Sequence, residues 1–141
     1  MAKTNTQKGG QPSPVWTGKG FELRFLCDFM KFAEKKPKYY NVFQPLIDDN
    51  GIDFVIRTKN REYKDIQVKG RSNNRTFTIA KKTKAHPNYW FVFYCKNSKD
   101  GSNYDRYIMN SKDVKPDNNN HIRFPVGKQN DDFDNIFKDH K

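Results

Sequence analysis

The alternation of apolar and polar residues predicts a β-hairpin near the middle of the chain. Residues 51–57 and 63–69 each alternate in this way, and a short polar segment separates them. Because successive side chains of a strand point to opposite faces, Asp53 lies on the polar face of the first strand. Gln67 and Lys69 project together from the polar face of the second strand. The hairpin therefore gathers a carboxylate, an amide and an ammonium.

The spacing of the two strands also indicates which residues face one another. A turn centred near Asn60 places Val68 opposite Asp53. A change of one residue in register brings Asp53 beside either Gln67 or Lys69. We therefore expect Asp53 to lie close to both polar side chains whichever register the hairpin adopts.

The rest of the pattern predicts a helix before the hairpin and further strands after it. Residues 19–33 are rich in apolar positions and contain no Pro, and Thr17 is a candidate N-cap. Residues 89–96 are almost all apolar, which is typical of a central strand buried on both faces. We expect short strands at residues 76–80, 105–109 and 121–126, a short helical turn capped at residues 110–111, and a short docking helix at residues 133–137. Residues 79–88 are the best place for a second long helix.

This order of elements predicts an α/β or α+β layer architecture, in which an N-terminal helix precedes a mixed central sheet flanked by helices. The chain has 141 residues, which is enough for one hydrophobic core. We expect residues 17–141 to form a single domain. Residues 1–16 are mostly polar and contain several Gly and Pro, so we expect a flexible arm there.

Glu22 is an unexpected residue for the predicted helix, because it lies on the stripe shared by Leu26 and Phe29. Burying an unpaired carboxylate costs on the order of several kcal/mol. Lys69 could compensate Glu22 as a buried ion pair, or a divalent cation shared with Asp53 could do so. Both alternatives stay open at the level of sequence.

These residues, in this order, resemble the PD-(D/E)xK nuclease superfamily. The matching stretches are residues 20–22 at the start of the helix, 51–53 in the first strand and 66–70 in the second. The chain is most similar to compact bacterial and archaeal members that resemble Holliday-junction resolvases and restriction-endonuclease-like domains. Gln67 stands at the family's second acidic position, as in several branches that keep a helix Glu, and Ile52 stands where the family motif has Pro.

The resemblance implies a restriction-endonuclease-like fold and a metal-dependent endonuclease that hydrolyses DNA phosphodiester bonds with Mg²⁺ or Mn²⁺. It implies that Asp53 binds the metal, together with the amide oxygen of Gln67 and the backbone carbonyl of Val68. Glu22 would bind the metal directly or through water. Lys69 would orient the attacking water and offset charge in the transition state. With two carboxylates, the site should bind metal weakly until a substrate phosphate adds a ligand.

Charge indicates a polyanionic partner. The chain has 27 Lys and Arg against 16 Asp and Glu, a formal net charge of +11, which favours nucleic acid through counterion release. Arg71 and Arg75 follow Lys69 closely and are candidates to hold the phosphates that flank the scissile one. Further candidates for nucleic-acid contact are Arg57, Lys81 and Lys82. We therefore expect duplex or branched DNA as partner, and homodimerisation is a hypothesis because relatives in the superfamily often pair two subunits.

Other features narrow the class of protein. No apolar run approaches transmembrane length, so we expect no membrane association. Cys27 and Cys95 fall on regular elements and are expected to be buried, reduced thiols of a cytoplasmic protein. The three histidines, His86, His121 and His140, lack metal-ligand spacing, and a structural zinc site is not expected.

Two alternatives to a nuclease stay open. The first is a catalytically degenerate nucleic-acid-binding module, which follows if Gln67 leaves the site with too little negative charge. Such a module would bind DNA without Mg²⁺ and would tolerate the change Asp53→Ala. The second is a basic protein-interaction factor from a mobile element, whose surface meets an acidic protein and whose DNA binding is weak.

Overall fold

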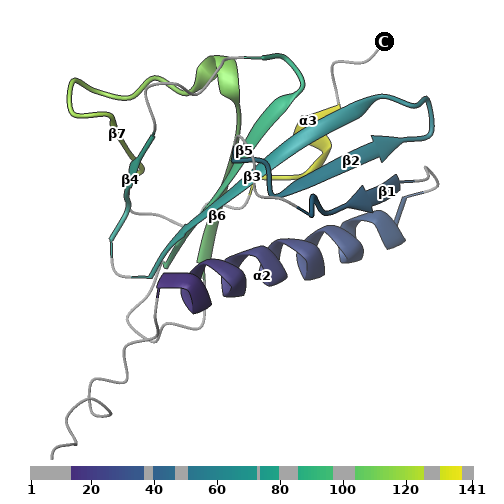
Figure 1. Ribbon diagram of the computed structural model, residues 1–141, viewed down its shortest axis with the longest axis horizontal. Helices are drawn as coiled ribbons and strands as arrows, with labels where there is room; N and C mark the ends of the chain where they lie inside the picture. Colours follow the sequence, from purple (N-terminus) through teal and green to yellow (C-terminus); the bar gives the residue numbers. More distant parts are fainter. Residues whose placement is uncertain are drawn as a thin grey trace, which may run out of the picture.

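A computed structural model shows a long helix packed on a five-stranded sheet, with a two-stranded ribbon beside it (Figure 1). The structure describes residues 14–36, 40–46, 51–72, 74–79, 86–96, 104–125 and 131–137. The helices are α2 (Pro14–Glu34) and α3 (Asp134–Phe137), with a 3-10 turn η1 (Ser111–Asp113). The strands are β1 (Tyr40–Phe43), β2 (Phe54–Thr58), β3 (Tyr63–Arg71), β4 (Thr76–Thr78), β5 (Tyr89–Lys96), β6 (Tyr104–Asn110) and β7 (His121–Arg123). The described chain is therefore an α+β protein with a mostly sheet core.

The main sheet is mixed, with the strand order β1-β2-β3-β5-β6. Strands β1, β2 and β3 form an antiparallel meander, and β5 pairs with β6 in the same manner. Strands β3 and β5 are parallel, so the chain must cross over between them. The crossover contains β4, which pairs with β7 in the separate ribbon.

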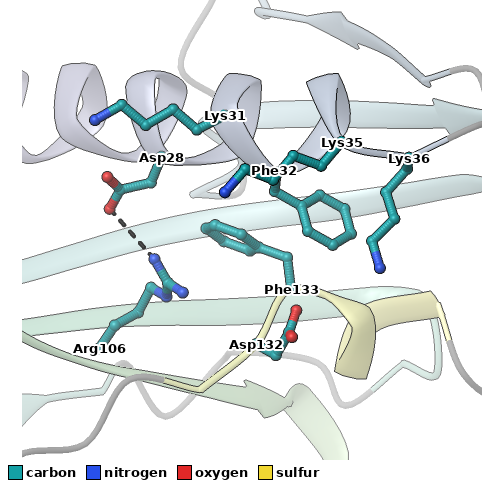
Figure 2. A pocket seen from close by; sticks show the side chains of 8 residues that line it. All are labelled: Asp28, Lys31, Phe32, Lys35, Lys36, Arg106, Asp132 and Phe133. Carbon is teal, nitrogen blue, oxygen red and sulfur yellow. Dashed lines mark hydrogen bonds and ion pairs between the residues drawn. The ribbon is translucent and has the colours of Figure 1, made fainter.

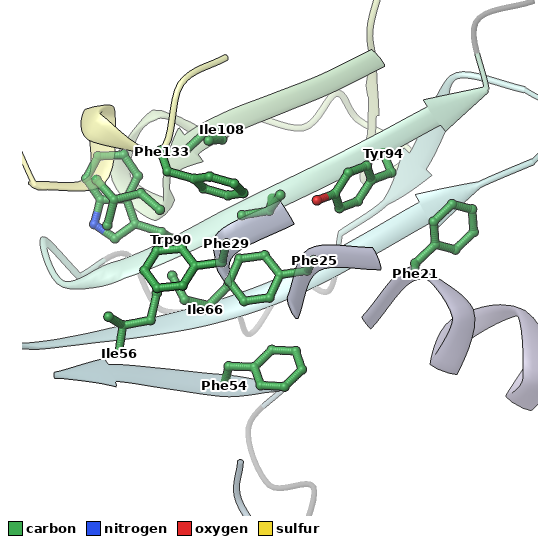
Figure 3. Packing of buried hydrophobic residues seen from close by; sticks show 12 residues of the cluster. Phe21, Phe25, Phe29, Phe54, Ile56, Ile66, Trp90, Tyr94, Ile108 and Phe133 are labelled. Atoms are coloured by element: carbon green, nitrogen blue, oxygen red, sulfur yellow. The ribbon is translucent and has the colours of Figure 1, made fainter. Parts of the chain in front are cut away.

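Helix α2 covers one face of the sheet through a stripe of phenylalanines. Phe21, Phe25 and Phe29 recur every fourth residue, so they lie on one side of the helix and point at the sheet (Figure 3). The rings of Phe25 and Phe54 are 5.1 Å apart and nearly parallel. The helix begins at Pro14, ahead of the predicted cap at Thr17, and Pro is well tolerated in a first helical turn.

Strand β5 is buried on both faces, as predicted. Trp90 and Val92 pack into the cluster under α2, while Phe91 and Phe93 pack on the opposite face. There they meet Phe77 of the β4–β7 ribbon, whose ring centroid lies 4.9 Å from that of Phe93. The nearly continuous apolar run is explained by these two cores.

Several sequence predictions differ from the structure. Strand β1 was not predicted, because its four residues show no clear alternation. The helix expected at residues 79–88 is absent from the described part of that segment, where Ile79 and residues 86–88 are non-helical. The strand expected at 121–126 ends at Arg123 and lies in the small ribbon.

Cys27 corrects the expectation that both thiols are buried. Cys95 is buried, but Cys27 is exposed, and both are free cysteines. Helix α2 packs on the sheet through one side only, so its opposite side faces solvent. Leu23 and Met30 on that side are 61% and 65% exposed.

Candidate active site

The register of the hairpin decides which residue faces Asp53. Phe54 pairs with Ile66 in the β2–β3 ladder. Extending that register by one residue places Asp53 across from Gln67 and not Val68. The structure thus adopts one of the two shifted registers considered from the sequence.

Asp53 is held against β3 by two hydrogen bonds. Its backbone N–H donates to the carbonyl of Ile66 at 2.8 Å. Its Oδ2 accepts the backbone N–H of Val68 at 2.7 Å. The N–H and C=O of a strand residue point to the same edge, so the carbonyl of Val68 is directed towards the Asp53 side. A carboxylate and a backbone carbonyl are therefore brought to one edge of β3, just before β2 begins.

Gln67 is oriented by a residue from the neighbouring parallel strand. The hydroxyl of Tyr89 donates to Oε1 of Gln67 at 2.8 Å. Burial, together with the negative charges of Asp53 and Asp65, raises the pKa of Tyr89 to about 12, so this hydroxyl stays protonated at neutral pH. Sequence analysis missed Tyr89, because its place beside Gln67 depends on the parallel pairing of β3 with β5. The only local signal was a hydroxyl at the start of an apolar run.

Gly51 closes the other side of the Gln67 amide. Gly51 has a φ of +73°, and a Cβ at this position would lie 2.9 Å from Nε2 of Gln67. Only glycine combines this backbone conformation with such a close approach. The Gln67 amide is thus confined between Gly51 and Tyr89, with its oxygen directed at the Tyr89 hydroxyl.

Lys69 shares the face of β3 that carries Gln67. Its side chain is partly buried, and this burial lowers the pKa of Lys69. The Asp53 carboxylate acts in the opposite direction and raises it, so the two side chains are close enough to interact. The structure therefore brings together Asp53, Gln67, Val68 and Lys69.

Glu22 takes a different place from the one that the sequence suggested. The buried stripe of α2 contains Phe21 and Phe25, and Glu22 lies on its flank with 20% of its side chain exposed. Its cationic partner is Lys19, whose Nζ is 3.5 Å from Oε1 of Glu22. Among the described residues, no ion pair joins Glu22 to Lys69. The link between α2 and the site is the ring of Phe21, which packs directly on Gly70.

Arg75, a predicted phosphate contact, is bound to acceptors within the protein. Its Nη2 donates to Oδ2 of Asp105 at 2.6 Å and to the hydroxyl of Tyr107 at 2.9 Å. Its Nε donates to the carbonyls of Phe124 and Pro125. The Arg75 side chain is only 11% exposed. These internal contacts make Arg75 a weaker candidate than an exposed arginine, and its phosphate contact stays a prediction.

The other predicted basic contacts differ in their surroundings. Arg71 is exposed, and its Nε donates to the carbonyl of Thr76 at 3.0 Å. Arg57 lies with its guanidinium 5.8 Å from the ring of Phe43. Lys81 and Lys82 lie outside the described residues. Of the predicted arginine contacts, only Arg71 is exposed, so it is the best placed of these to meet a polyanion.

The described residues contain no group of three or more His, Cys, Asp or Glu side chains placed to hold a metal ion. None of the described helices has the length and apolar character needed to cross a membrane. No family model, no curated protein and no solved structure matches the chain.

Proposed function

We propose that the protein is a metal-dependent DNA endonuclease of the PD-(D/E)xK type, acting through Asp53, Gln67 and Lys69 with Glu22 assisting. The observation that carries the proposal is the hydrogen bond from the Val68 N–H to Asp53. It holds a carboxylate against the backbone between Gln67 and Lys69. The net charge of +11 supports a polyanionic substrate.

The order of the elements supports a restriction-endonuclease-like core. Helix α2 comes first, the meander β1-β2-β3 carries the candidate site, and β5 and β6 complete the sheet. One departure from the expected arrangement is that the crossover from β3 to β5 contains the expected strand β4 but no helix at Ile79 or residues 86–88, the described part of the segment where a helix was expected.

The donor atoms fit a hard divalent cation such as Mg²⁺ or Mn²⁺. Such cations prefer carboxylate, amide and carbonyl oxygens, which Asp53, Gln67 and Val68 provide. A carboxylate has about four acceptor positions, so Asp53 can accept the Val68 N–H and still bind a cation. When bound, the metal would polarise the phosphodiester and lower the pKa of a coordinated water.

The protein residues would position the reacting groups around that metal. Gln67 presents a neutral oxygen whose direction is set by Tyr89, so it contributes geometry and no charge. Lys69 is held near Asp53, where its ammonium can bind the attacking water and offset negative charge in the transition state. Glu22 would reach the site through water, after its exposed contact with Lys19 opens.

One observation favours the alternative of a catalytically degenerate nucleic-acid-binding module. Oε1 of Gln67 accepts the Tyr89 hydroxyl, so the amide oxygen already has a partner within the protein. With a neutral and partly occupied ligand at this position, metal affinity could be too low for turnover. Both functions share the basic surface, and the decisive difference between them is catalysis.

The test is cleavage of linear duplex, four-way junction and single-stranded DNA in Mg²⁺ or Mn²⁺. The variants Asp53→Asn and Lys69→Ala should each lose at least about a hundredfold in rate. Asp113→Asn and Lys112→Ala make the same changes at exposed residues of η1 and should keep the activity of the natural chain. Cleavage that survives in the Asp53 variant would refute the proposed site.

Two other outcomes would identify the alternatives. Salt-sensitive DNA binding without cleavage at any metal concentration would favour the degenerate binding module. If DNA is neither cut nor bound in a salt-dependent manner, the protein-interaction factor becomes the better account. Homodimerisation and a cytoplasmic location stay predictions, and sedimentation over a range of protein concentrations tests the first.

A further inference from the structure

A second concave site lies on the α2 side of the sheet. A cavity of about 430 Å³ is bounded by α2, by β6 and by the segment that leads into α3 (Figure 2). Gln67 and Lys69 project from the opposite face of the sheet, because they alternate with Ile66, which packs under α2. The cavity is therefore separate from the candidate active site.

Four cationic side chains line this cavity. They are Lys31 of α2, Lys35 and Lys36 directly after that helix, and Arg106 of β6. Lys31 in the last turn of α2 and Lys35 just past its end are four residues apart, and their like charges repel. Within the described residues neither of these two lysines has an ion-pair partner, whereas Lys36 contacts Asp134 at 2.9 Å. Lys31 and Lys35 thus bring unmatched positive charge to a concave surface, which concentrates its field.

The two carboxylates of the cavity wall are already engaged. Oδ2 of Asp28 accepts the Tyr94 hydroxyl at 2.9 Å and lies 3.4 Å from Nη1 of Arg106. Oδ1 of Asp132 accepts the backbone N–H of Asp134 at 2.9 Å. These contacts leave the amines of the two unpaired lysines as the charges most available to a ligand.

Arg106 is held rigidly beside an aromatic wall. Its guanidinium lies 4.2 Å from the ring centroid of Phe133, and its Nε donates to the carbonyl of Asp131 at 2.9 Å. Phe32 adds a half-buried ring beside Phe133, with the two ring centroids 5.7 Å apart in an edge-to-face arrangement (Figure 2). The site therefore combines a fixed planar cation, two lysines and an aromatic surface.

We propose that this cavity binds a nucleotide, with its phosphoryl group on Lys31, Lys35 and Arg106 and its base against Phe32. Arginine and lysine together suit a phosphoryl dianion, and aromatic rings stack on bases of any sequence. The cavity volume falls in the range of small-molecule sites, roughly 300–1,000 Å³. The nucleotide is either a free molecule or one unit of a nucleic-acid chain. The inference does not depend on the proposed nuclease activity.

The test is calorimetric titration of the full chain with deoxyadenosine 5′-monophosphate, deoxyadenosine and inorganic phosphate. The monophosphate should bind saturably, and deoxyadenosine should bind at least about tenfold more weakly. The double variant Lys31→Gln with Lys35→Gln should weaken binding of the monophosphate at least about tenfold. Lys59→Gln with Lys115→Gln removes the same charge at two exposed lysines outside the cavity and should leave this affinity unchanged.

Further experiments separate the contribution of the base from that of the phosphoryl group. They also distinguish a free nucleotide from one unit of a nucleic-acid chain. Phe32→Leu should weaken the monophosphate and spare inorganic phosphate. If an oligonucleotide displaces the monophosphate and binds the Lys31 and Lys35 double variant more weakly, the natural ligand is a nucleic-acid chain. If the oligonucleotide leaves the monophosphate bound, the natural ligand is a free nucleotide. Absence of saturable binding, or equal weakening in both lysine pairs, would overturn the proposal.

Discussion

At the scale of single residues, the candidate site holds groups that do not favour folding. Burial lowers the pKa of Lys69, so the unfolded chain binds this proton more tightly than the folded chain does. The folded state is therefore penalised at every pH below the folded pKa of Lys69. The penalty disappears as pH rises past the ordinary value of 10.5. Such a penalty is expected where a side chain is kept for chemistry and not for packing.

We therefore expect Lys69→Met to stabilise the protein at neutral pH, on the order of 1 kcal/mol. The gain should shrink as pH approaches 10.5, because Lys69 then loses its charge in both states. Urea denaturation of the natural chain and of the variant at a series of pH values measures this gain in the free energy of unfolding. Lys59→Met, at an exposed turn position, is the control and should change little. A loss of stability at pH 7 would mean that the attraction between Lys69 and Asp53 outweighs the cost of burying the charge of Lys69.

At the scale of elements, the docking of α2 on β3 decides how the helix approaches the site. The ring of Phe21 occupies the space that a side chain at position 70 would need. Gly70 follows Lys69 directly in β3, so the contact fixes the helix at the end of the strand that carries the site. The sequence shows a glycine and a phenylalanine, but their contact depends on the packing of the two elements.

Gly70→Ala should accordingly destabilise the fold by about 2 kcal/mol or more, because its Cβ would collide with the Phe21 ring. Gly20→Ala is a matched control inside α2, where a Cβ meets no atom within 4 Å. That control should stabilise the protein by up to about 1 kcal/mol through helix propensity. Thermal unfolding of both variants makes the comparison. Equal melting temperatures would argue against the close contact of α2 with β3.

At the scale of the whole molecule, the sheet has a hydrophobic cluster on each face. The second cluster is closed by the β4–β7 ribbon, which meets the sheet through Phe77 of β4 and through Phe124, directly after β7. Arg75, which precedes β4, forms an ion pair with the fully buried Asp105 of β6. This pair ties the ribbon to the sheet, so removal of one partner leaves a buried charge uncompensated.

Arg75→Met should therefore cost about 3 kcal/mol of unfolding free energy. Adding Asp105→Asn should recover part of that loss, because the buried charge is then gone. Arg71→Met, at an exposed arginine, should cost less than about 1 kcal/mol. Urea denaturation of the single and double variants gives the coupling energy. Strict additivity of Arg75→Met and Asp105→Asn would contradict the role assigned to the pair.

Much of the fold could be predicted because it leaves a local record in the sequence. The alternation around Asp53 and Gln67 reports a strand with one buried face, and the run at 89–96 reports burial on both. Short elements such as β1 leave too few residues for a pattern. The candidate site was predictable as far as one hairpin brings its residues together, which applies to Asp53, Gln67 and Lys69.

What the sequence by itself determined is the local structure and the total charge: the hairpin, the long helix, the central strand and the excess of basic residues. Tertiary structure alone decided the partners of individual polar groups. It paired Glu22 with Lys19, committed Arg75 to Asp105 and placed Tyr89 on Gln67. The physical reason is that periodicity records only whether a side chain is buried. Its partner depends on which distant elements pack together, as the parallel pairing of β3 with β5 shows.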